Sequence, residues 1–328
     1  MCITLLSTAH PDYPFILINN RDEFLSRPTA PAAWWDGPDS HVLGGRDLQR
    51  EERGTWLGIT RQGRLANLTN FREEGVEVSK DKSRGGLTSA YLTPPPGQEW
   101  SEEGLAKHLI DGVGLHDVGG FTLLYGTLRA PSSQDGAMPG LSVLSNRTSS
   151  TSSMSHIATR AGEIHGLSNS HFGDLTWPKV IHGEQLLRQS IKANVDRRDD
   201  QDHFIEALFD ILSIDTLPRP KEGEDFHTYT RQLRNSILIP PVGGKTSGSS
   251  TAENLSAAAA PNSTPAPRNS HRSIDANAYG TQQQSVILVN KEGHVTFVER
   301  TLYTFDGQPQ RGHEGERRIA FNIEGWDG

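Results

Sequence analysis

Hydrophobic residues in this chain fall into short runs that are separated by polar, turn-forming segments. The apolar runs CITLLS and PFILIN are joined by AHPDY, which carries Pro and Asp. The same arrangement recurs four more times, so the pattern predicts five hairpin-like pairs of antiparallel strands. The later pairs are GTWLGIT with GRLANLTN, 121–128 with 141–146, SHIATR with EIHGLSN, and SVILVN with HVTFVER.

Three segments between the strand pairs have apolar residues at helical spacing. The first, 101–113, begins with a Ser cap followed by acidic residues. The second, 177–195, begins with a Trp-Pro pair, and the third, 199–214, has an acidic first turn. Hairpins with helices grouped between them predict an α+β fold in which two antiparallel sheets pack face to face with helices outside. We expect one domain over 1–328.

Two segments lack the apolar residues that a packed element needs. The range 243–278 is rich in Ser, Ala, Pro and Asn, and burial cannot offset the entropy of ordering it. We expect a disordered insertion there, within the domain, because a strand pair returns after it. The range 130–155 contains the serine-rich stretch TSSTSSMS, and we expect a flexible loop at a sheet edge.

Charge and cysteine content narrow the classes of function. The net charge is −8, which argues against non-specific nucleic-acid binding, since that requires a basic face. A single cysteine allows no intramolecular disulfide. The first basic residue is Arg21, and the apolar stretch 15–18 is too short for a signal core or a membrane span. We therefore expect a cytoplasmic protein with no membrane span and no bound metal.

The single cysteine, Cys2, directly follows the initiator methionine. One interpretation is a small buried hydrophobe in the first strand, which is how most free cysteines behave. The other is an N-terminal nucleophile. If Met1 is removed, Cys2 carries both a thiol and a free α-amine that can accept the thiol proton.

The segment NNRDEF directly follows the second predicted strand. In a tight antiparallel hairpin the end of the second strand lies beside the start of the first. Asn20, Arg21 and Asp22 should therefore lie within reach of the N-terminus. A carboxylate or amide there could hold the α-amine of Cys2, which is the third group that an N-terminal nucleophile requires.

Two asparagines end other strand patterns, Asn70 in NLTNF and Asn169 in GLSNS. Asparagine at a strand end is usually a turn residue. Together with Cys2 and Asp22, both are also candidate donors to the oxyanion that develops during acyl transfer.

Several motifs in order resemble the NRDE-motif family, the homologues of transport and Golgi organisation protein 2. They are MCI, NNRDEFLSRP, GTWLG, LTNFR, RGG and HGLSN. The resemblance implies an αββα sandwich similar to the N-terminal nucleophile hydrolases. It also implies that Cys2 is the nucleophile, that Asp22 orients its amine, and that Asn70 and Asn169 are active-site asparagines.

The chain departs from this pattern at two positions. Within the N-terminal nucleophile hydrolases, the resemblance points to the chemistry of bile-salt hydrolases and penicillin V acylases. These enzymes carry an arginine three residues before the aspartate, where this chain has Asn19 and places Arg21 beside Asp22 instead. Many relatives carry an arginine after a YGT triplet, where this chain has Gln282. Less positive charge near Cys2 would stabilise its thiolate less.

Two functions of different classes follow from the resemblance. One is a hydrolase or acyltransferase that attacks an amide or thioester acyl bond. The other is a non-catalytic carrier that uses the same cleft for haem or an acyl lipid, with His165 and His171 as the candidate haem ligands. The family's links to secretory organisation, lipid metabolism and haem movement imply association with the Golgi or mitochondria. The implied partner is a small-molecule acyl substrate, a lipid or haem.

Four further residues are candidates for substrate binding. Trp34 and Trp35 could wall a ligand pocket, although a Trp pair near a strand is more often core or edge packing. Arg72 and Arg84 could meet a substrate carboxylate or phosphate. For Arg84, a solvated arginine at the start of a helix is an equal alternative.

Overall fold

The computed structural model describes residues 1–71, 84–95, 100–115, 118–218, 226–243, 278–310 and 312–327. Residues 244–277, nearly all of the predicted insertion, lie outside this part of the chain. The strands are β1 (Ile3–Ser7), β2 (Phe15–Phe24), β3 (Thr29–Trp34), β4 (Val42–Asp47), β5 (Leu57–Thr60), β6 (Arg64–Asn70), β7 (Phe121–Thr127), β8 (Leu141–Ser145), β9 (Ser155–Ile157), β10 (Ile164–Ser168), β11 (Tyr279–Val289), β12 (His294–Thr301) and β13 (Glu316–Asn322). The α-helices are α1 (Arg84–Leu92), α2 (Glu102–Lys107), α3 (Pro178–Arg197), α4 (Gln201–Leu212) and α5 (Phe226–Thr230).

The strands form two antiparallel sheets. One has six strands in the order β10-β1-β2-β11-β12-β13, and the other has seven in the order β3-β4-β5-β6-β7-β8-β9. The N-terminal strand is therefore interior to the six-stranded sheet, between β10 and β2. This position fixes the first residues of the chain against neighbours on both sides.

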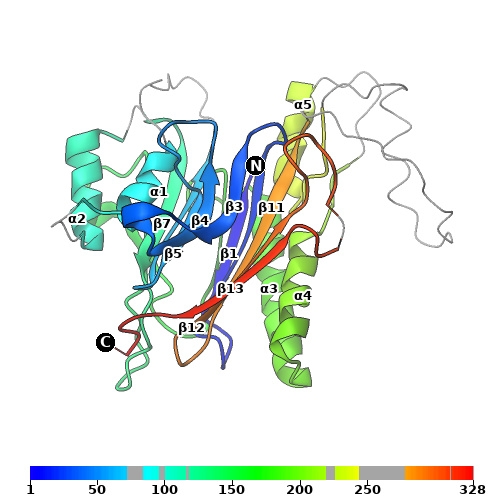
Figure 1. The fold of residues 1–328 in the computed structure, drawn as a ribbon. Coiled ribbons are helices and arrows are strands. Elements are labelled where there is room, and N and C mark those ends of the chain that lie inside the picture. The colour runs from blue at the N-terminus through cyan, green and yellow to red at the C-terminus, as the bar shows by residue number, and fades with distance from the viewer. Residues whose placement is uncertain are drawn as a thin grey trace.

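The two sheets pack face to face with helices on their outer faces (Figure 1). Helices α3 and α4 cover the six-stranded sheet, and their apolar residues share a buried cluster with β1, β2, β11 and β12. Helices α1 and α2 cover the seven-stranded sheet through a second cluster. The arrangement is an αββα sandwich, which confirms the predicted fold.

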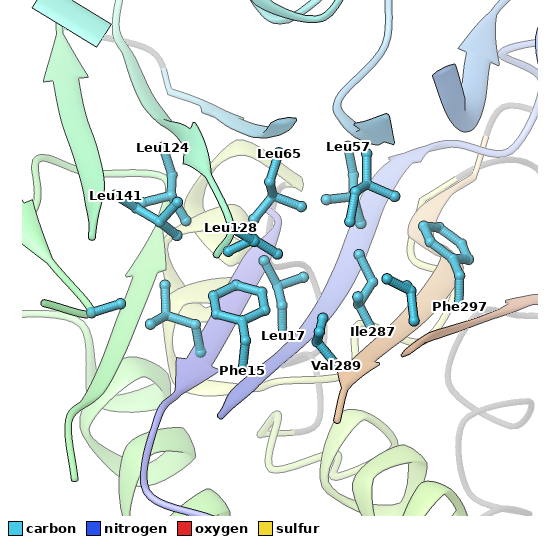
Figure 2. Close-up of a cluster of buried hydrophobic side chains, with 14 of the residues drawn as sticks. Phe15, Leu17, Leu57, Leu65, Leu124, Leu128, Leu141, Ile287, Val289 and Phe297 are labelled. Carbon is cyan, nitrogen blue, oxygen red and sulfur yellow. The ribbon is translucent and has the colours of Figure 1, made fainter. Parts of the chain in front are cut away.

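The inner faces of both sheets supply the central core (Figure 2). Leu17 and Ile287 project from the six-stranded sheet toward Leu57, Leu65 and Leu124 of the seven-stranded sheet. Alternate residues of each strand point inward because side chains alternate across a pleated strand. Apolar burial on both faces thus stabilises the interior strands, including the first.

Four of the five predicted hairpins are confirmed. In the first, the polar segment after PFILIN continues as strand, since β2 runs to Phe24 and its residues Asn19 to Asp22 are buried. The strand continues because β11 pairs with β2 along its whole length, from Val289 opposite Phe15 to Tyr279 opposite Phe24. β3, β4 and β13 were not predicted.

The prediction that SHIATR and EIHGLSN form a hairpin is wrong. β9 pairs with β8 in the seven-stranded sheet, whereas β10 pairs with β1 in the other sheet. The carboxylate of Glu163 accepts hydrogen bonds from the amides of Ala158, Thr159 and Arg160 at 2.9–3.1 Å. Those bonds satisfy the backbone where the chain crosses from one sheet to the other.

The predicted helices are present with small shifts. Ser101 caps α2 by accepting a hydrogen bond from the Gly104 amide, and Asp200 caps α4 in the same way through the His203 amide. A π-helical turn, His108–Val113, follows α2. The range 130–155 contains β8, and β9 begins at its last residue. β8 pairs with β7 on one side and with β9 on the other, so the range is not the continuous loop that we expected. β9 is the edge strand of this sheet.

Candidate active site at the start of the chain

The register of the first hairpin places the N-terminus against the NRDE segment. Ile3 pairs with Asn20, so Cys2 falls opposite Arg21 and Met1 opposite Asp22. This confirms that the end of β2 lies beside the start of β1. The local pairing of two neighbouring strands is sufficient to build this contact.

Met1 is held at three points. Its α-amine donates a hydrogen bond to the Tyr279 hydroxyl and lies 3.5 Å from Oδ2 of Asp22. Its carbonyl oxygen accepts a hydrogen bond of 2.5 Å from Nζ of Lys179. Its side chain packs against a buried apolar cluster that includes Leu233 and Ile239. Burial lowers the pKa of the Met1 amine, and the negative charge of Asp22 opposes that shift.

Asp22 is the buried carboxylate of the site. Its Oδ1 accepts a hydrogen bond of 2.7 Å from the Thr281 hydroxyl. Its Oδ2 has no hydrogen-bond partner among the described residues and instead faces two cations, the Met1 amine at 3.5 Å and Nζ of Lys179 at 4.0 Å. Both side chains of the Asp22–Lys179 pair are fully buried. Burial lowers the pKa of Lys179, and the charge of Asp22 opposes that shift.

The Cys2 thiol lies beside the backbone of Asp22. Its Sγ is 3.8 Å from the backbone oxygen of Asp22, and its own carbonyl accepts a hydrogen bond of 2.6 Å from the Ser168 hydroxyl on β10. Cys2 is half-buried. Burial raises the pKa of the thiol, and the nearby α-ammonium group opposes the rise. With Met1 in place, the thiol is therefore predominantly protonated at neutral pH.

Arg21 lies opposite Cys2 and points toward the seven-stranded sheet. Its guanidinium group stacks on Trp56 at 4.3 Å from the ring centroid and donates a hydrogen bond to the side-chain oxygen of Gln282. The strand pairing shifts by one residue between Thr281 and Gln283, which is a β-bulge at Gln282. Gln282, which stands where many relatives have an arginine, thus fixes the orientation of Arg21.

Asn70 and Asn169 lie next to each other where the two sheets meet. The Asn169 side-chain amide donates a hydrogen bond to the backbone oxygen of Asn70, and the Thr69 hydroxyl bonds the Ser168 carbonyl at 2.8 Å. Because Ser168 also bonds the carbonyl of Cys2, these contacts bring both asparagines to the end of the chain that carries the thiol. The structure thus assembles Cys2, Asp22, Asn70 and Asn169 in one region.

Asn20 has a different environment from the one expected. Its side-chain amide donates hydrogen bonds to the carbonyls of Leu212 and Ile237 at 2.8 and 2.9 Å. This corrects the expectation that Asn20 holds the α-amine with Asp22. The residue instead ties the end of α4 and the segment after residue 235 to the sheet.

Replacing Asn20 with Ala is expected to lower the free energy of unfolding by about 1–3 kcal/mol, because two buried carbonyls lose their donors. Urea unfolding measures this change. The exposed Asn322 on β13 is the control, and Asn322→Ala should change stability by less than about 0.5 kcal/mol. Equal stability of the two variants would contradict the assignment.

The two tryptophans lie in packed positions. Trp35 is buried in the cluster beneath α1 and donates a hydrogen bond of 3.0 Å to the Gly44 carbonyl. Trp34 stacks under the guanidinium group of Arg61 at 4.0 Å and packs edge-on against Phe321. Both positions match the packing alternative. The tryptophan that lies beside Arg21 and Cys2 is Trp56.

Arg84 is the first residue of α1, and Arg72 lies outside the described residues. The Arg84 guanidinium donates hydrogen bonds to the carbonyls of Phe71 and Gly120 at 3.3 and 3.1 Å. It is therefore bound to backbone carbonyls at the start of the helix and is half-buried. His165 lies 2.7 Å from the Glu163 carboxylate, and the His171 ring packs edge-on against Phe71.

Sequence reasoning missed Lys179, Tyr279 and Thr281, which complete the surroundings of Asp22. The signal for Lys179 was available, since it is four and eight residues before Gly183 and Leu187 on the buried stripe of α3. A lysine on an apolar stripe indicates a buried charge that needs a partner. Tyr279 and Thr281 begin a strand far along the chain and gave no such signal.

Glu299 is a second buried carboxyl group, between the sheets on β12. Its Oε1 accepts a hydrogen bond of 2.7 Å from the Ala32 amide. Burial raises its pKa from 4.5 to about 7, and the charges of Arg317 and Arg21 oppose the shift. Near neutral pH a fraction of the molecules therefore carries this group protonated.

Stability should fall as pH rises through 7, because the folded state binds the Glu299 proton more tightly than the unfolded state. The contribution of Glu299 to the free energy of unfolding is complete below pH 4.5 and is lost above pH 7, a difference of about 3 kcal/mol. Urea midpoints from pH 4.5 to 8 measure it. Glu299→Gln should flatten this profile relative to wild type, while Glu324→Gln at an exposed site should not. Parallel profiles for wild type and Glu299→Gln would contradict the prediction.

Among the helices that the structure describes, none combines the length and apolar character that crossing a membrane requires.

Two solved structures resemble this fold weakly. The N-acylethanolamine-hydrolyzing acid amidase orthologue of Caenorhabditis elegans is 13% identical, with a TM-score of 0.39, over 65% of this chain and 86% of that one. The C2A mutant of conjugated bile acid hydrolase from Clostridium perfringens is 11% identical, with a TM-score of 0.40, over 100% of this chain and 94% of that one.

Sequence relatives match over nearly the whole chain. A Saccharomyces cerevisiae protein is 28% identical over 98% of this chain and 100% of its own length. The transport and Golgi organization protein 2 homolog of Bos taurus is 30% identical over 90% of this chain and 88% of its own length. The family model described as Transport and Golgi organisation 2 matches residues 1–304. With its NRDE segment paired against Cys2, the chain therefore belongs to the Transport and Golgi organisation 2 family.

Proposed function

We propose that, once Met1 is removed, this protein is an N-terminal cysteine hydrolase or acyltransferase that acts on an amide or thioester acyl bond. One observation carries the proposal: the buried carboxylate of Asp22 lies 3.5 Å from the amine at the start of the chain, and the Cys2 thiol lies 3.8 Å from the backbone oxygen of the same residue. A thiol, an amine and a carboxylate that fixes the amine are the parts that this chemistry requires.

In the proposed reaction, the α-amine of Cys2 takes the thiol proton and the thiolate attacks the substrate carbonyl carbon. The tetrahedral intermediate collapses with loss of an amine or a thiol, which receives the proton from the α-ammonium group. The acyl group is left as a thioester on Sγ. Water or a second nucleophile then attacks this thioester, the C–S bond breaks, and the thiol regains its proton.

The surrounding residues have separate roles in this reaction. Asp22 holds the α-amine, and the amides of Asn70 and Asn169 donate hydrogen bonds to the developing oxyanion. Arg21 supplies the positive charge that favours the thiolate. Trp56 and Gln282 fix the Arg21 guanidinium group, so Arg21 takes the place of the arginine that is missing at Asn19.

The first test is the intact mass of the native protein before and after a brief treatment with iodoacetamide at neutral pH. We expect Met1 to be absent and Cys2 to react much faster than it does in the unfolded chain. Retained Met1 would overturn the mechanism, because Cys2 would then have no free amine. An inert Cys2 in a protein without Met1 would overturn the enzyme proposal and favour the carrier of haem or an acyl lipid.

Location in the cell remains a separate prediction. The names of the animal relatives refer to transport and Golgi organization. A fluorescent tag at the C-terminus leaves the start of the chain free and tests the expected cytoplasmic distribution. Concentration at Golgi or mitochondrial membranes would support the association that the family resemblance implies.

A further inference from the structure

The space that Met1 occupies has the features of a ligand site. We call it the Met1 chamber and define it by Asp22, Lys179, Tyr279, Leu233, Ile239 and Val242. Each part of Met1 has a matching group there. Asp22 and Tyr279 bind the amine, Lys179 binds the carbonyl oxygen, and the apolar residues pack around the side chain.

The charges of the chamber are built into the fold and do not depend on Met1. Asp22 and Lys179 are fully buried, and Oδ2 of Asp22 has no hydrogen-bond donor among the described residues. When Met1 leaves, the Tyr279 hydroxyl loses the amine that donates to it, and Lys179 loses its carbonyl acceptor at 2.5 Å. Buried polar groups without partners are costly, so the empty chamber favours a ligand that restores both contacts.

The chamber is open to a ligand from solvent. Met1 retains 25% of its side-chain exposure, so its removal leaves an opening at the surface. The remaining wall is apolar, because Leu233, Ile239 and Val242 are each at most 6% exposed. The chamber therefore selects a compound with a primary amine, a neighbouring carbonyl and an apolar side chain.

We propose that the vacated Met1 chamber binds apolar α-amino amides through their free amine. This inference rests on the proposed function for the removal of Met1 and for the role of the bound amine. Because Met1 is joined directly to Cys2, a ligand in the chamber lies beside the Cys2 nitrogen. Its free amine is then placed to accept the acyl group in transfer.

In transfer, the neutral amine attacks the carbonyl carbon of the thioester on Cys2. A C–N bond forms, the C–S bond breaks, and the proton lost from the amine passes through the α-amine of Cys2 to Sγ. No oxidant, reductant or further reactant is needed.

The test uses the full chain carrying Cys2→Ala, with absence of Met1 verified by intact mass. Because this variant lacks the thiol, binding is measured without turnover. The probe is L-methioninamide, and the control ligand is N-acetyl-L-methioninamide, which has the same side chain and carbonyl but no ammonium group. At saturation we expect L-methioninamide to raise the thermal midpoint by about 2–5 °C and the acetylated control to leave it unchanged.

Two further variants localise the binding. Adding Leu233→Trp, which fills the chamber, should abolish the shift, whereas Arg234→Ala at the exposed neighbouring position should preserve it. Adding Asp22→Asn should weaken binding by about tenfold or more, because it removes the negative charge that faces the amine at 3.5 Å. Equal binding of both ligands, or no saturable shift with L-methioninamide, would overturn the inference.

These results separate the chamber from the proposed function. A shift with L-methioninamide in the Cys2→Ala protein supports the chamber even if wild-type Cys2 is inert to iodoacetamide, in which case only the enzyme proposal fails. Fast alkylation of wild-type Cys2 without any shift in the variant overturns the chamber alone.

Discussion

Cys2→Ala is expected to lower the hydrolysis of an activated acyl thioester by a factor of about 10³–10⁴, because the nucleophile of the proposed reaction is absent. Wild type should also gain the mass of the acyl group during turnover, and the variant should not. Quenched intact-mass measurements on both proteins test the second expectation. The variant should fold normally, since the thiol is half-buried and its contact with the backbone oxygen of Asp22, at 3.8 Å, is weak.

A chain with one added residue before Cys2 that resists removal is the matched control. It keeps the thiol but blocks the α-amine, so it should lose activity to a similar extent as Cys2→Ala. If this blocked chain were as active as wild type, the thiol would not depend on its own amine. If Cys2→Ala were as active as wild type, Cys2 would not be the nucleophile.

Asp22→Ala is expected to lower the free energy of unfolding by about 3–5 kcal/mol, because it leaves the fully buried Lys179 without its carboxylate. The double variant Asp22→Ala, Lys179→Met should recover a large part of this loss, since a buried pair replaced by apolar groups is often tolerated. Urea unfolding of wild type, both single variants and the double variant yields the coupling energy of the pair.

The control is an ion pair on α3, the helix that carries Lys179. Lys192 and Asp196 form an exposed ion pair on α3, with side chains 75% and 59% exposed. Asp196→Ala should therefore change stability by less than about 0.5 kcal/mol. Additive effects of Asp22→Ala and Lys179→Met would contradict the assignment of a coupled buried pair.

Sequence reasoning brought residues to the site in two ways, through local strand pairing and through family motifs. The first hairpin joins two apolar runs through a short turn, so its register brings Asp22 to the N-terminus by local pairing alone. Asn70 and Asn169 were predicted from their motifs to approach the same site, and the contacts between Thr69, Ser168 and Cys2 place them there. Hydrophobic alternation also indicated the two sheets, because each strand has one face to bury.

Local sequence patterns were misleading where the same pattern is compatible with two different strand pairings or two different side-chain environments. Apolar and polar residues alternate in β9 and β10 as they do in a hairpin. However, β9 pairs with β8 in one sheet, and β10 pairs with β1 in the other. Asn20 and Asp22 lie on the same face of β2, yet the end of α4 covers Asn20, whereas Asp22 meets α3 and the N-terminus. Which carbonyls or charges lie above a strand depends on the helices packed there, and strand residues alone do not specify that packing.

The sequence by itself indicated an α+β sandwich, and it determined the hairpin that brings Cys2 to the NRDE segment and the candidates Cys2, Asp22, Asn70 and Asn169. Only the tertiary structure decided that Lys179 and Tyr279 complete the surroundings of Asp22 and that Gln282 orients Arg21. The physical reason is the range of the interactions. Strand pairing across a short turn is encoded by adjacent residues, whereas burial of a lysine against an aspartate requires a distant helix and a bulged late strand to pack on the same end of the sheet.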